Sequence, residues 1–339
     1  MVDRLPLSAH TSYAELMERL RLARIGDFPA AAKFVSKTVK GRLYWYVQMP
    51  TGGGGGRKQV YVGPDSEALQ ARIASHGRVR ADAEDRRRLV MAILVSGAIR
   101  PDRLTGDLMS ALADAGVFRL RAVLVGTVAY QTYGGLLGVR MPPNAIGTQD
   151  VDIAQDFGIA TNLDDAVDRP LLDILRTVDP GFQAVSYAFD ASKAASYALG
   201  ERYRVDVLTT NRNAPRDEPS RPPTLKSDAT PLQYMDFLLR ETVETAVLHG
   251  SGILVNVPTP ARYAVHKLIV SRDRKVNPEK GQKDRLQAAH LIEALSLEDP
   301  FALRDAYGEA RDRGPEWRKL LDEAVSLLPE AARAVLEKP

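Results

Sequence analysis

The segment that most constrains this chain of 339 residues is GTQDVDIA, at positions 147–154. Asp150 and Asp152 alternate with Val151 and Ile153, which predicts a strand with one apolar face and both carboxylates on the other face. Aspartate is unfavourable inside a strand, and two like charges on one face repel each other. Such a pair needs a positive partner, and a divalent metal ion is the simplest one.

A third carboxylate has the same setting. Asp206 stands between Val205 and Val207, which predicts a second strand with the same alternation. Three carboxylates on two adjacent strands suit a two-metal site, in which the ions lie about 3.5–4 Å apart and assist the attacking and leaving oxygens. We predict that Asp150 and Asp152 bridge two Mg²⁺ ions and that Asp206 orients or deprotonates the nucleophile. The alternative is an exposed edge strand whose polar residues face water, and the third aspartate weakens it.

A strand-to-helix turn precedes these aspartates. Residues 120–126 predict a buried strand and residues 127–133 a helix, which Gly134 and Gly135 are expected to end. Gly126 would let the backbone approach a phosphate, and the start of the helix would offer unpaired N–H donors. The Thr127 hydroxyl would add one donor. The same two residues also occur where a turn needs them for its own geometry.

Four motifs carry a resemblance to the DNA-polymerase-β-like nucleotidyltransferase superfamily, and within it to a bacterial group of nucleotidyltransferase-fold proteins: QTYGGLLG at 131–138, TQDVDIA at 148–154, RVDVL at 204–208 and AVHKLIV at 264–270. The resemblance covers about residues 104–298. It implies an α+β fold in which helices flank a short mixed sheet. It also implies Mg²⁺ dependence and transfer of a nucleoside monophosphate from an NTP, ATP among them, with release of pyrophosphate.

The chain departs from the superfamily in the spacing of its motifs. Asp150 comes 24 residues after Gly126 (150 − 126), farther than is usual, so residues 134–147 form an additional loop. Arg140 lies in that loop and is expected either to reach the triphosphate or to lie on the surface. By the resemblance, Lys267 contacts the triphosphate as a point charge; the alternative is a solvated lysine.

Two further basic regions leave alternatives open. One is a basic stretch that comprises Lys275, Lys280, Lys283, Asp284 and Arg285. It either faces the nucleotide or an RNA acceptor, or is a solvated loop. The other is a predicted β-hairpin at 41–63, with a glycine tip at Gly52–Gly56. The hairpin either binds nucleic acid through stacked aromatic residues and tip cations, or is a small sheet whose aromatic residues form its own core. A helix is predicted to follow it from Ser66 to Val95.

The length predicts more than one domain. We expect an N-terminal helical region with the hairpin at 1–103, a catalytic domain at 104–258 and a helical domain at 259–339. The chain has no cysteine, which excludes disulfides and thiolate catalysis. It shows no apolar run of about 18 residues and no signal peptide, so we expect a cytoplasmic protein without a membrane span.

The predicted function is therefore Mg-dependent transfer of an NMP to an RNA 3′ end, a protein hydroxyl or a small molecule. The alternative is a catalytically inactive nucleotide- or RNA-binding module of the same fold, against which the intact set of three carboxylates argues. Relatives in the superfamily that act as toxins or in phage defence suggest such a role by analogy. The base, the acceptor and the oligomeric state stay open.

Overall fold

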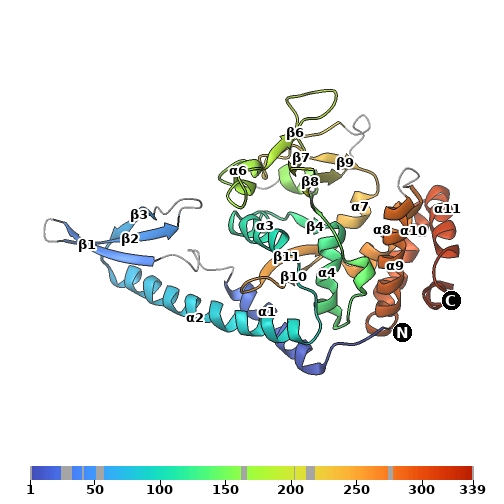
Figure 1. The fold of residues 1–339 in the computed structure, drawn as a ribbon, viewed down its shortest axis with the longest axis horizontal. Coiled ribbons are helices and arrows are strands. Elements are labelled where there is room, and N and C mark those ends of the chain that lie inside the picture. The colour runs from blue at the N-terminus through green and yellow to red at the C-terminus, as the bar shows by residue number, and fades with distance from the viewer. Residues whose placement is uncertain are drawn as a thin grey trace.

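The computed structural model describes residues 2–23, 33–39, 42–50, 57–161, 166–201, 203–210, 218–273 and 278–337. At the centre of the described chain lies a six-stranded sheet (Figure 1). Its strands, in spatial order, are β4 (Val123–Val125), β5 (Asp150–Gln155), β8 (Tyr203–Thr210), β7 (Ser196–Leu199) and β6 (Gln183–Val185), with β9 (Thr230–Leu232) also paired to β8. The β5–β8 and β8–β9 pairs are parallel and the others antiparallel, so the predicted short mixed sheet is confirmed.

Strands β5 and β8 form because apolar residues alternate with polar ones. Val151 and Ile153 on β5, and Val205 and Val207 on β8, are fully buried. Because side chains alternate between the two faces of a strand, the residues between them point to the opposite face. The predicted pair of Asp-bearing strands is thus present.

Helices make up most of the rest of the body. They are α3 (Arg103–Asp114), α4 (Gly126–Leu137), α6 (Leu171–Leu175), α7 (Met235–Leu239), α8 (Pro260–Asp273), α9 (Pro278–Glu298), α10 (Pro300–Asp312), α11 (Pro315–Ser326) and α12 (Glu330–Glu337), with short helices at Pro143–Ala145 (η1) and Phe157–Thr161 (α5). A two-stranded sheet of β10 (Thr242–Val247) and β11 (Ile253–Pro258) completes the body. The described elements after β11 are all helices.

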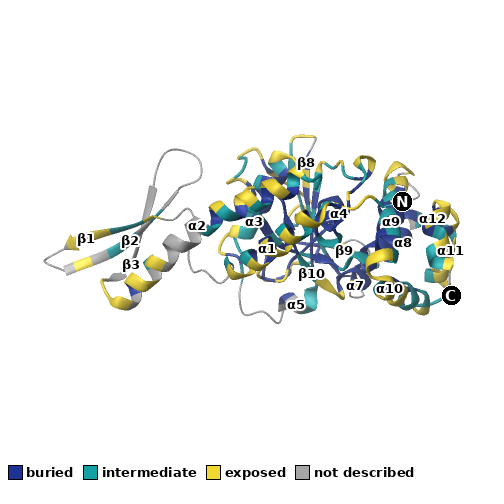
Figure 2. Cartoon of the chain, turned by 90° about the horizontal axis from the view of Figure 1, so that it is seen from below, coloured by how far each residue is buried: buried dark blue, intermediate teal, exposed yellow. Residues whose placement is uncertain are grey.

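One cluster of buried side chains joins the sheet to the C-terminal helices. It runs from Leu108 to Ala332 and crosses the predicted domain boundary at residue 258. Figure 2 shows these buried residues concentrated around the sheet, α4, α8 and α9. The helices after residue 258 therefore pack on the same core as the sheet, which gives the site a rigid wall on that side.

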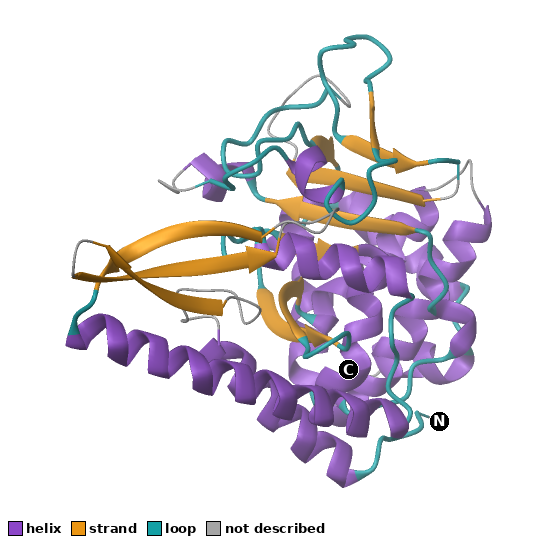
Figure 3. Cartoon of the chain, turned by 60° about the vertical axis from the view of Figure 1, so that its left-hand side comes forward, coloured by secondary structure: helices purple, strands orange, loops and turns teal. Residues whose placement is uncertain are grey.

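The N-terminal part forms an arm. It comprises a three-stranded antiparallel sheet of β1 (Lys33–Val39), β2 (Arg42–Pro50) and β3 (Arg57–Pro64), and helix α2 (Glu67–Val95). Figures 1 and 3 show the sheet beside the end of α2 that points away from the C-terminal helices. The predicted hairpin corresponds to β2 and β3, whereas β1 was not predicted, and the glycine tip lies outside the described residues.

Helix α2 is as predicted, and Ser66 caps it by accepting a hydrogen bond from the Leu69 N–H at 3.2 Å. Its C-terminal half packs against α1 (Leu7–Ala23) through a small separate core in which Leu16 and Ile93 are fully buried. This core anchors the arm to the body.

Gly134 and Gly135 do not end helix α4, so that prediction was wrong. The helix continues to Leu137 and ends at Gly138, which has a left-handed φ of 64°. A Cβ at position 135 would lie less than 3.0 Å from the ring of Tyr13. Gly135 thus lets α1 approach α4 closely.

Candidate active site

A cleft of about 280 Å³ opens at the ends of β4, β5 and β8, between the sheet and helices α8 and α9. Its polar lining consists of Gly126, Thr127, Asp150, Asp152, Asp206, Gln233, Tyr263, His266, Lys267, Lys280, Lys283 and Asp284. Its apolar lining consists of Val125, Leu208, Leu232, Met235, Leu238 and Val270. Every predicted site residue except Arg140 lines this cleft.

The three aspartates share one face of the sheet. In the parallel β5–β8 ladder, Asp152 lies directly opposite Asp206, and Asp150 precedes Asp152 by two residues. Neighbouring strands are about 4.8 Å apart, so side chains that point the same way from opposite positions come close together. The structure therefore brings the three predicted carboxylates into one cleft.

Two of these carboxylates are turned toward separate partners. The Thr148 hydroxyl donates to Asp150, whose Oδ2 also lies 3.7 Å from the Lys280 Nζ. The Ser196 hydroxyl donates to Asp206 Oδ1 at 2.5 Å. Within the described residues no three acidic or histidine side chains are gathered closely enough to hold a metal ion as they stand. The metal-ligand role of the three aspartates stays a prediction.

The crowding of negative charge is visible in the protonation of Asp152. Burial, followed by the charges of Asp150 and Asp206, raises the pKa of Asp152 to about 7. Burial also raises the pKa of Asp206, although the hydrogen bond from Ser196 opposes that shift. A buried group with like charges beside it is costly to ionise. The cleft therefore holds negative charge that a cation would relieve.

The turn between β4 and α4 fits closely against the Asp152 carboxylate. Gly126 has a φ of +66°, and a Cβ there would lie less than 3.0 Å from Asp152 Oδ2. Both the backbone conformation and the contact therefore require glycine. Helix α4 begins here without a side-chain cap, and the next residue, Thr127, is buried in the cleft. The N–H groups of a first helical turn have no partner within the helix, which suits an anion.

Two residues that the sequence did not single out hold the turn in place. The Tyr263 hydroxyl lies 2.8 Å from the Gly126 carbonyl oxygen and 2.9 Å from Gln287 Oε1. Gln287 Nε2 in turn donates to the Ala145 carbonyl at 2.8 Å and weakly to Thr127 Oγ1 at 3.4 Å. One available signal was the spacing of Tyr263 and Lys267, since residues four apart share a helix face.

Lys267 is not a solvated lysine, so that alternative is wrong. Only 7% of the residue is exposed, and its Nζ lies 2.6 Å from Asp284 Oδ1 and 5.3 Å from the centre of the Tyr263 ring. The pair joins α8 to α9 at the wall of the cleft. Contact of this lysine with a triphosphate stays a prediction.

Two lysines of the basic stretch also reach the cleft. Lys280 and Lys283 lie on helix α9 rather than in a solvated loop, while Lys275 lies outside the described residues. Lys283 donates to the carbonyl of Gly147, just before β5, and burial lowers the pKa of Lys283. The cleft thus has carboxylates on its sheet wall and amines on its α9 wall.

Arg140 lies elsewhere, which corrects its predicted contact with the triphosphate. Its backbone N–H donates to the Asp3 carbonyl at 2.8 Å, and its Nε lies 3.2 Å from Asp3 Oδ2. The N-terminal segment runs beside residues 138–140 and holds this arginine away from the cleft. It is not among the residues that line the site.

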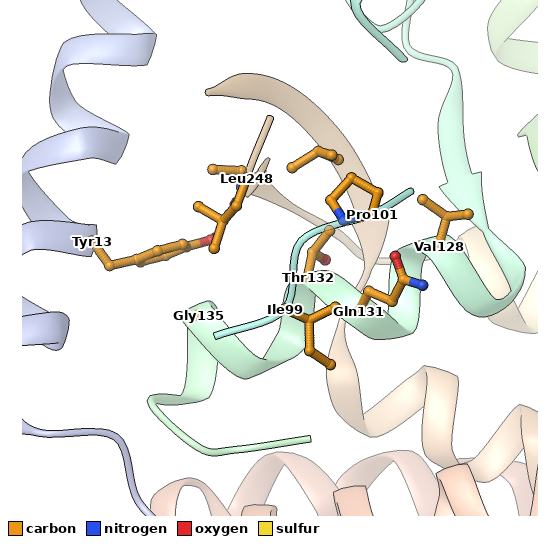
Figure 4. Close-up of a pocket in the computed structure, with 10 residues that line it drawn as sticks. Tyr13, Ile99, Pro101, Val128, Gln131, Thr132, Gly135 and Leu248 are labelled. Carbon is orange, nitrogen blue, oxygen red and sulfur yellow. Dashed lines mark hydrogen bonds between the residues drawn. The ribbon is translucent and has the colours of Figure 1, made fainter. Parts of the chain in front are cut away.

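Two other hollows are lined neither by the three aspartates nor by the Gly126–Thr127 turn. Figure 4 shows the smaller one, between Tyr13 on α1 and Gln131 and Thr132 on α4; at about 10 Å³ it has room for about one water molecule. The larger one, of about 500 Å³, is lined by side chains such as Arg285 and Glu316 and by none of the three aspartates. The cleft at the sheet is therefore the candidate active site.

The cleft combines paired aspartates on one strand of a mixed sheet, a third aspartate on the parallel neighbour and a glycine turn beside them. The chain belongs to the nucleotidyltransferase family, whose model matches residues 103–312. That range includes every element of the cleft, so the protein is an enzyme of the transferase class.

A solved structure, that of an antigenic nucleotidyltransferase-like protein from Paracoccidioides brasiliensis, is similar at 15% identity. The likeness covers 64% of this chain and 93% of that one with a TM-score of 0.32. No curated protein matches the sequence significantly. In the described chain, no helix is both long and apolar enough to cross a membrane.

Proposed function

We propose that the protein is a Mg²⁺-dependent nucleotidyltransferase of the polymerase-β-like kind. It transfers a nucleoside monophosphate from an NTP to an acceptor hydroxyl on RNA, a protein or a small molecule. The observation that carries the proposal is the position of Asp150, Asp152 and Asp206 on one face of the sheet, with the Gly126–Thr127 turn in the same cleft.

The residues present fit magnesium. Mg²⁺ prefers oxygen ligands, and the three carboxylates supply them from two rigid strands. The raised pKa of Asp152 indicates that the nearby Lys267 and Lys280 do not offset the burial of this carboxylate and the charges of Asp150 and Asp206. Asp150, Asp152 and Asp206 are the residues that would hold the ions. When bound, the ions would polarise the α-phosphate and neutralise charge on the leaving group.

The turn and the lysines would bind the triphosphate. The first N–H groups of α4 and the Thr127 hydroxyl face the cleft and offer donors to phosphate oxygens. Lys280 and Lys283 add positive charge from the opposite wall. Since Asp152 Oδ2 lies against Gly126, the phosphate donors and the metal ligands are held at a fixed spacing.

The transfer needs no reactant other than the NTP and the acceptor hydroxyl. The acceptor oxygen forms a bond to the α-phosphorus, and the bond from that phosphorus to the bridging oxygen breaks. Pyrophosphate leaves with the electron pair of the broken bond. Asp206 would orient the acceptor hydroxyl and take up its proton, which then passes to water.

The test is label transfer by the purified full-length chain. The protein is incubated with Mg²⁺, each α-labelled NTP, and total RNA or lysate, and compared with Asp150→Asn. Asp305→Asn is the matched control, because this aspartate is exposed on α10 and outside the cleft. We expect transfer by the wild type and the control only.

Three results would count against the proposal. Undiminished transfer by Asp150→Asn would remove the carboxylates from the mechanism. Binding of Mg-NTP by the wild type without transfer to any acceptor would instead support the inactive binding module. Absence of any binding would contradict both functions.

A further inference from the structure

A hydrogen-bonded network ties the turn at Gly126 to the helical wall of the cleft. Tyr263 on α8 and Gln287 on α9 are buried, with 1% and 0% of each residue exposed. The Tyr263 hydroxyl reaches the Gly126 carbonyl oxygen at 2.8 Å and Gln287 Oε1 at 2.9 Å. Gln287 Nε2 reaches the Ala145 carbonyl and, more weakly, Thr127 Oγ1. Both residues of the turn are therefore held by side chains from outside α4.

The direction of these hydrogen bonds follows from their groups. The Ala145 carbonyl can only accept, so Gln287 presents its Nε2 to it and its Oε1 to Tyr263. Tyr263 then faces two carbonyl acceptors with one proton, which they share. Burial raises the pKa of Tyr263 well above its ordinary value, so the hydroxyl keeps this proton near neutral pH. Tyr263 is thus a donor to the turn.

Fixing the Gly126 carbonyl also fixes the next N–H group. A trans peptide is planar, and its C=O and N–H bonds point in opposite directions. The Thr127 N–H therefore points away from Tyr263 and out of the start of α4, where the helix offers it no partner. Because Gln287 donates to Thr127 Oγ1, that hydroxyl keeps its own proton for another acceptor. The network thus orients two donors of the turn in advance.

We propose that Tyr263 and Gln287 are positioning residues that set the affinity of the cleft for the triphosphate of an NTP. They act through the N–H and hydroxyl of Thr127 rather than by contact with the phosphates. Donors that are already ordered lose less conformational freedom when the anion binds, which raises affinity. The inference rests on the proposed function and identifies the buried groups that determine its substrate binding. A network that only supported the fold would leave the affinity unchanged.

The experiment compares nucleotide binding and turnover in the full-length wild type and Tyr263→Phe, which lacks only the hydroxyl. Calorimetric titration with Mg²⁺ and ATP, CTP, GTP, UTP or inorganic tripolyphosphate gives Kd, and label transfer gives KM and kcat. We expect Kd and KM to rise about fivefold in the variant. The kcat should stay within about twofold, because ground-state and transition-state binding are lost together. The rise in Kd should be the same for every probe, since the donors meet phosphates and not the base.

A second variant and a matched control separate positioning from stability. Gln287→Met should weaken binding by a similar factor, and the double variant by no more than the weaker single one, because both act on one turn. The control is Tyr133→Phe. The Tyr133 hydroxyl is buried on α4 and donates to the Pro258 carbonyl at 2.8 Å, and Tyr133 does not line the cleft. This control should lower the unfolding midpoint as Tyr263→Phe does and leave Kd unchanged. Circular dichroism shows whether each variant is folded.

Several outcomes would overturn the inference while leaving the proposed function intact. They are an unchanged Kd in folded Tyr263→Phe, a rise confined to one NTP, and an equal rise in Tyr133→Phe. A fall in kcat with constant Kd would also contradict it, because the hydroxyl would then act in the chemical step. A wild type that binds neither an NTP nor tripolyphosphate would overturn both the inference and the proposed function.

Discussion

Two clusters of charged residues lie along helix α8, and their acidic groups behave in opposite ways. In the cleft, burial and neighbouring aspartates raise the pKa of Asp152 to about 7. At the N-terminal end of α8, Arg262 is only 3% exposed and lies 2.9 Å from Glu241 and 2.6 Å from Glu309. The hydrogen bond from Arg262 lowers the pKa of Glu309 to about 2.

The difference separates a stabilising cluster from a functional one. Glu309 also pairs with Arg240 and Arg313, so its negative charge is satisfied within the folded chain. The Arg262 guanidinium further lies 4.9 Å from the centre of the Phe237 ring. In the cleft, like charges are held together at a cost to folding. Strongly perturbed groups of that kind are typical of ligand and catalytic sites.

The largest expected effect is on the functional cluster. Asp152→Asn should lower label transfer on the order of 10³-fold, because a proposed metal ligand is lost. It should not lower the thermal unfolding midpoint at neutral pH, since the variant removes a like charge from the cleft. Transfer rates and melting curves of the metal-free protein test both parts. A variant that melts well below the wild type would show that Asp152 supports the fold.

A change in the stabilising cluster around Arg262 should lower stability and leave transfer nearly unchanged. Arg262→Met should lower the free energy of unfolding by about 3 kcal/mol, because it leaves acidic groups without their buried partner. Transfer per folded molecule should stay within about twofold when measured below the melting transition. Denaturant unfolding gives the first quantity. A specific loss of transfer in the folded variant would mean that the two clusters are coupled through α8.

A change at the glycine turn should lower both the stability of the protein and its transfer activity. Gly126→Ala places a Cβ against Asp152 Oδ2 and strains a left-handed backbone, at a cost of about 1–2 kcal/mol. Displacement of the carboxylate should lower transfer about 10²-fold. Gly308→Ala on α10 is the control, because no atom lies within 4 Å of its added Cβ. If Gly126→Ala retains full activity, the close fit between turn and carboxylate is not needed.

Local patterns were enough to predict the carboxylate part of the site. The alternation of Asp150 and Asp152 with valine and isoleucine, repeated around Asp206, is a property of a few consecutive residues. The strands, their shared face and the helices after residue 259 follow from such short-range patterns. The turn at Gly126 was predicted for the same reason.

What the sequence did not predict depends on contacts between distant residues. Arg140 meets Asp3, and Tyr263 reaches both Gly126 and Gln287, across separations for which one sequence gives no signal. The role of Gly135 was misinterpreted for the same reason, because the Tyr13 ring that packs against its backbone belongs to α1. The buried state of Lys267 also depends on a partner from another helix.

The smallest expected effect, and the most direct comparison of the two clusters, is the pH dependence of stability in EDTA. The pKa of Asp152 is raised from 3.8 to about 7, so its stabilising contribution is complete below pH 3.8 and lost as pH rises through about 7. The pKa of Glu309 is lowered from 4.5 to about 2, so its contribution is present above pH 4.5 and lost as pH falls through about 2.

Between pH 4.5 and 7, therefore, the contribution of Asp152 changes while that of Glu309 stays constant. The melting temperature of the wild type should fall by several degrees relative to that of Asp152→Asn as pH rises across this range. Saturating Mg²⁺ should abolish the difference by stabilising the ionised carboxylates. Parallel melting curves for the two proteins in EDTA would mean that Asp152 ionises normally. The Asp152 carboxylate would then be no more costly to ionise than the carboxylates of the Arg262 cluster.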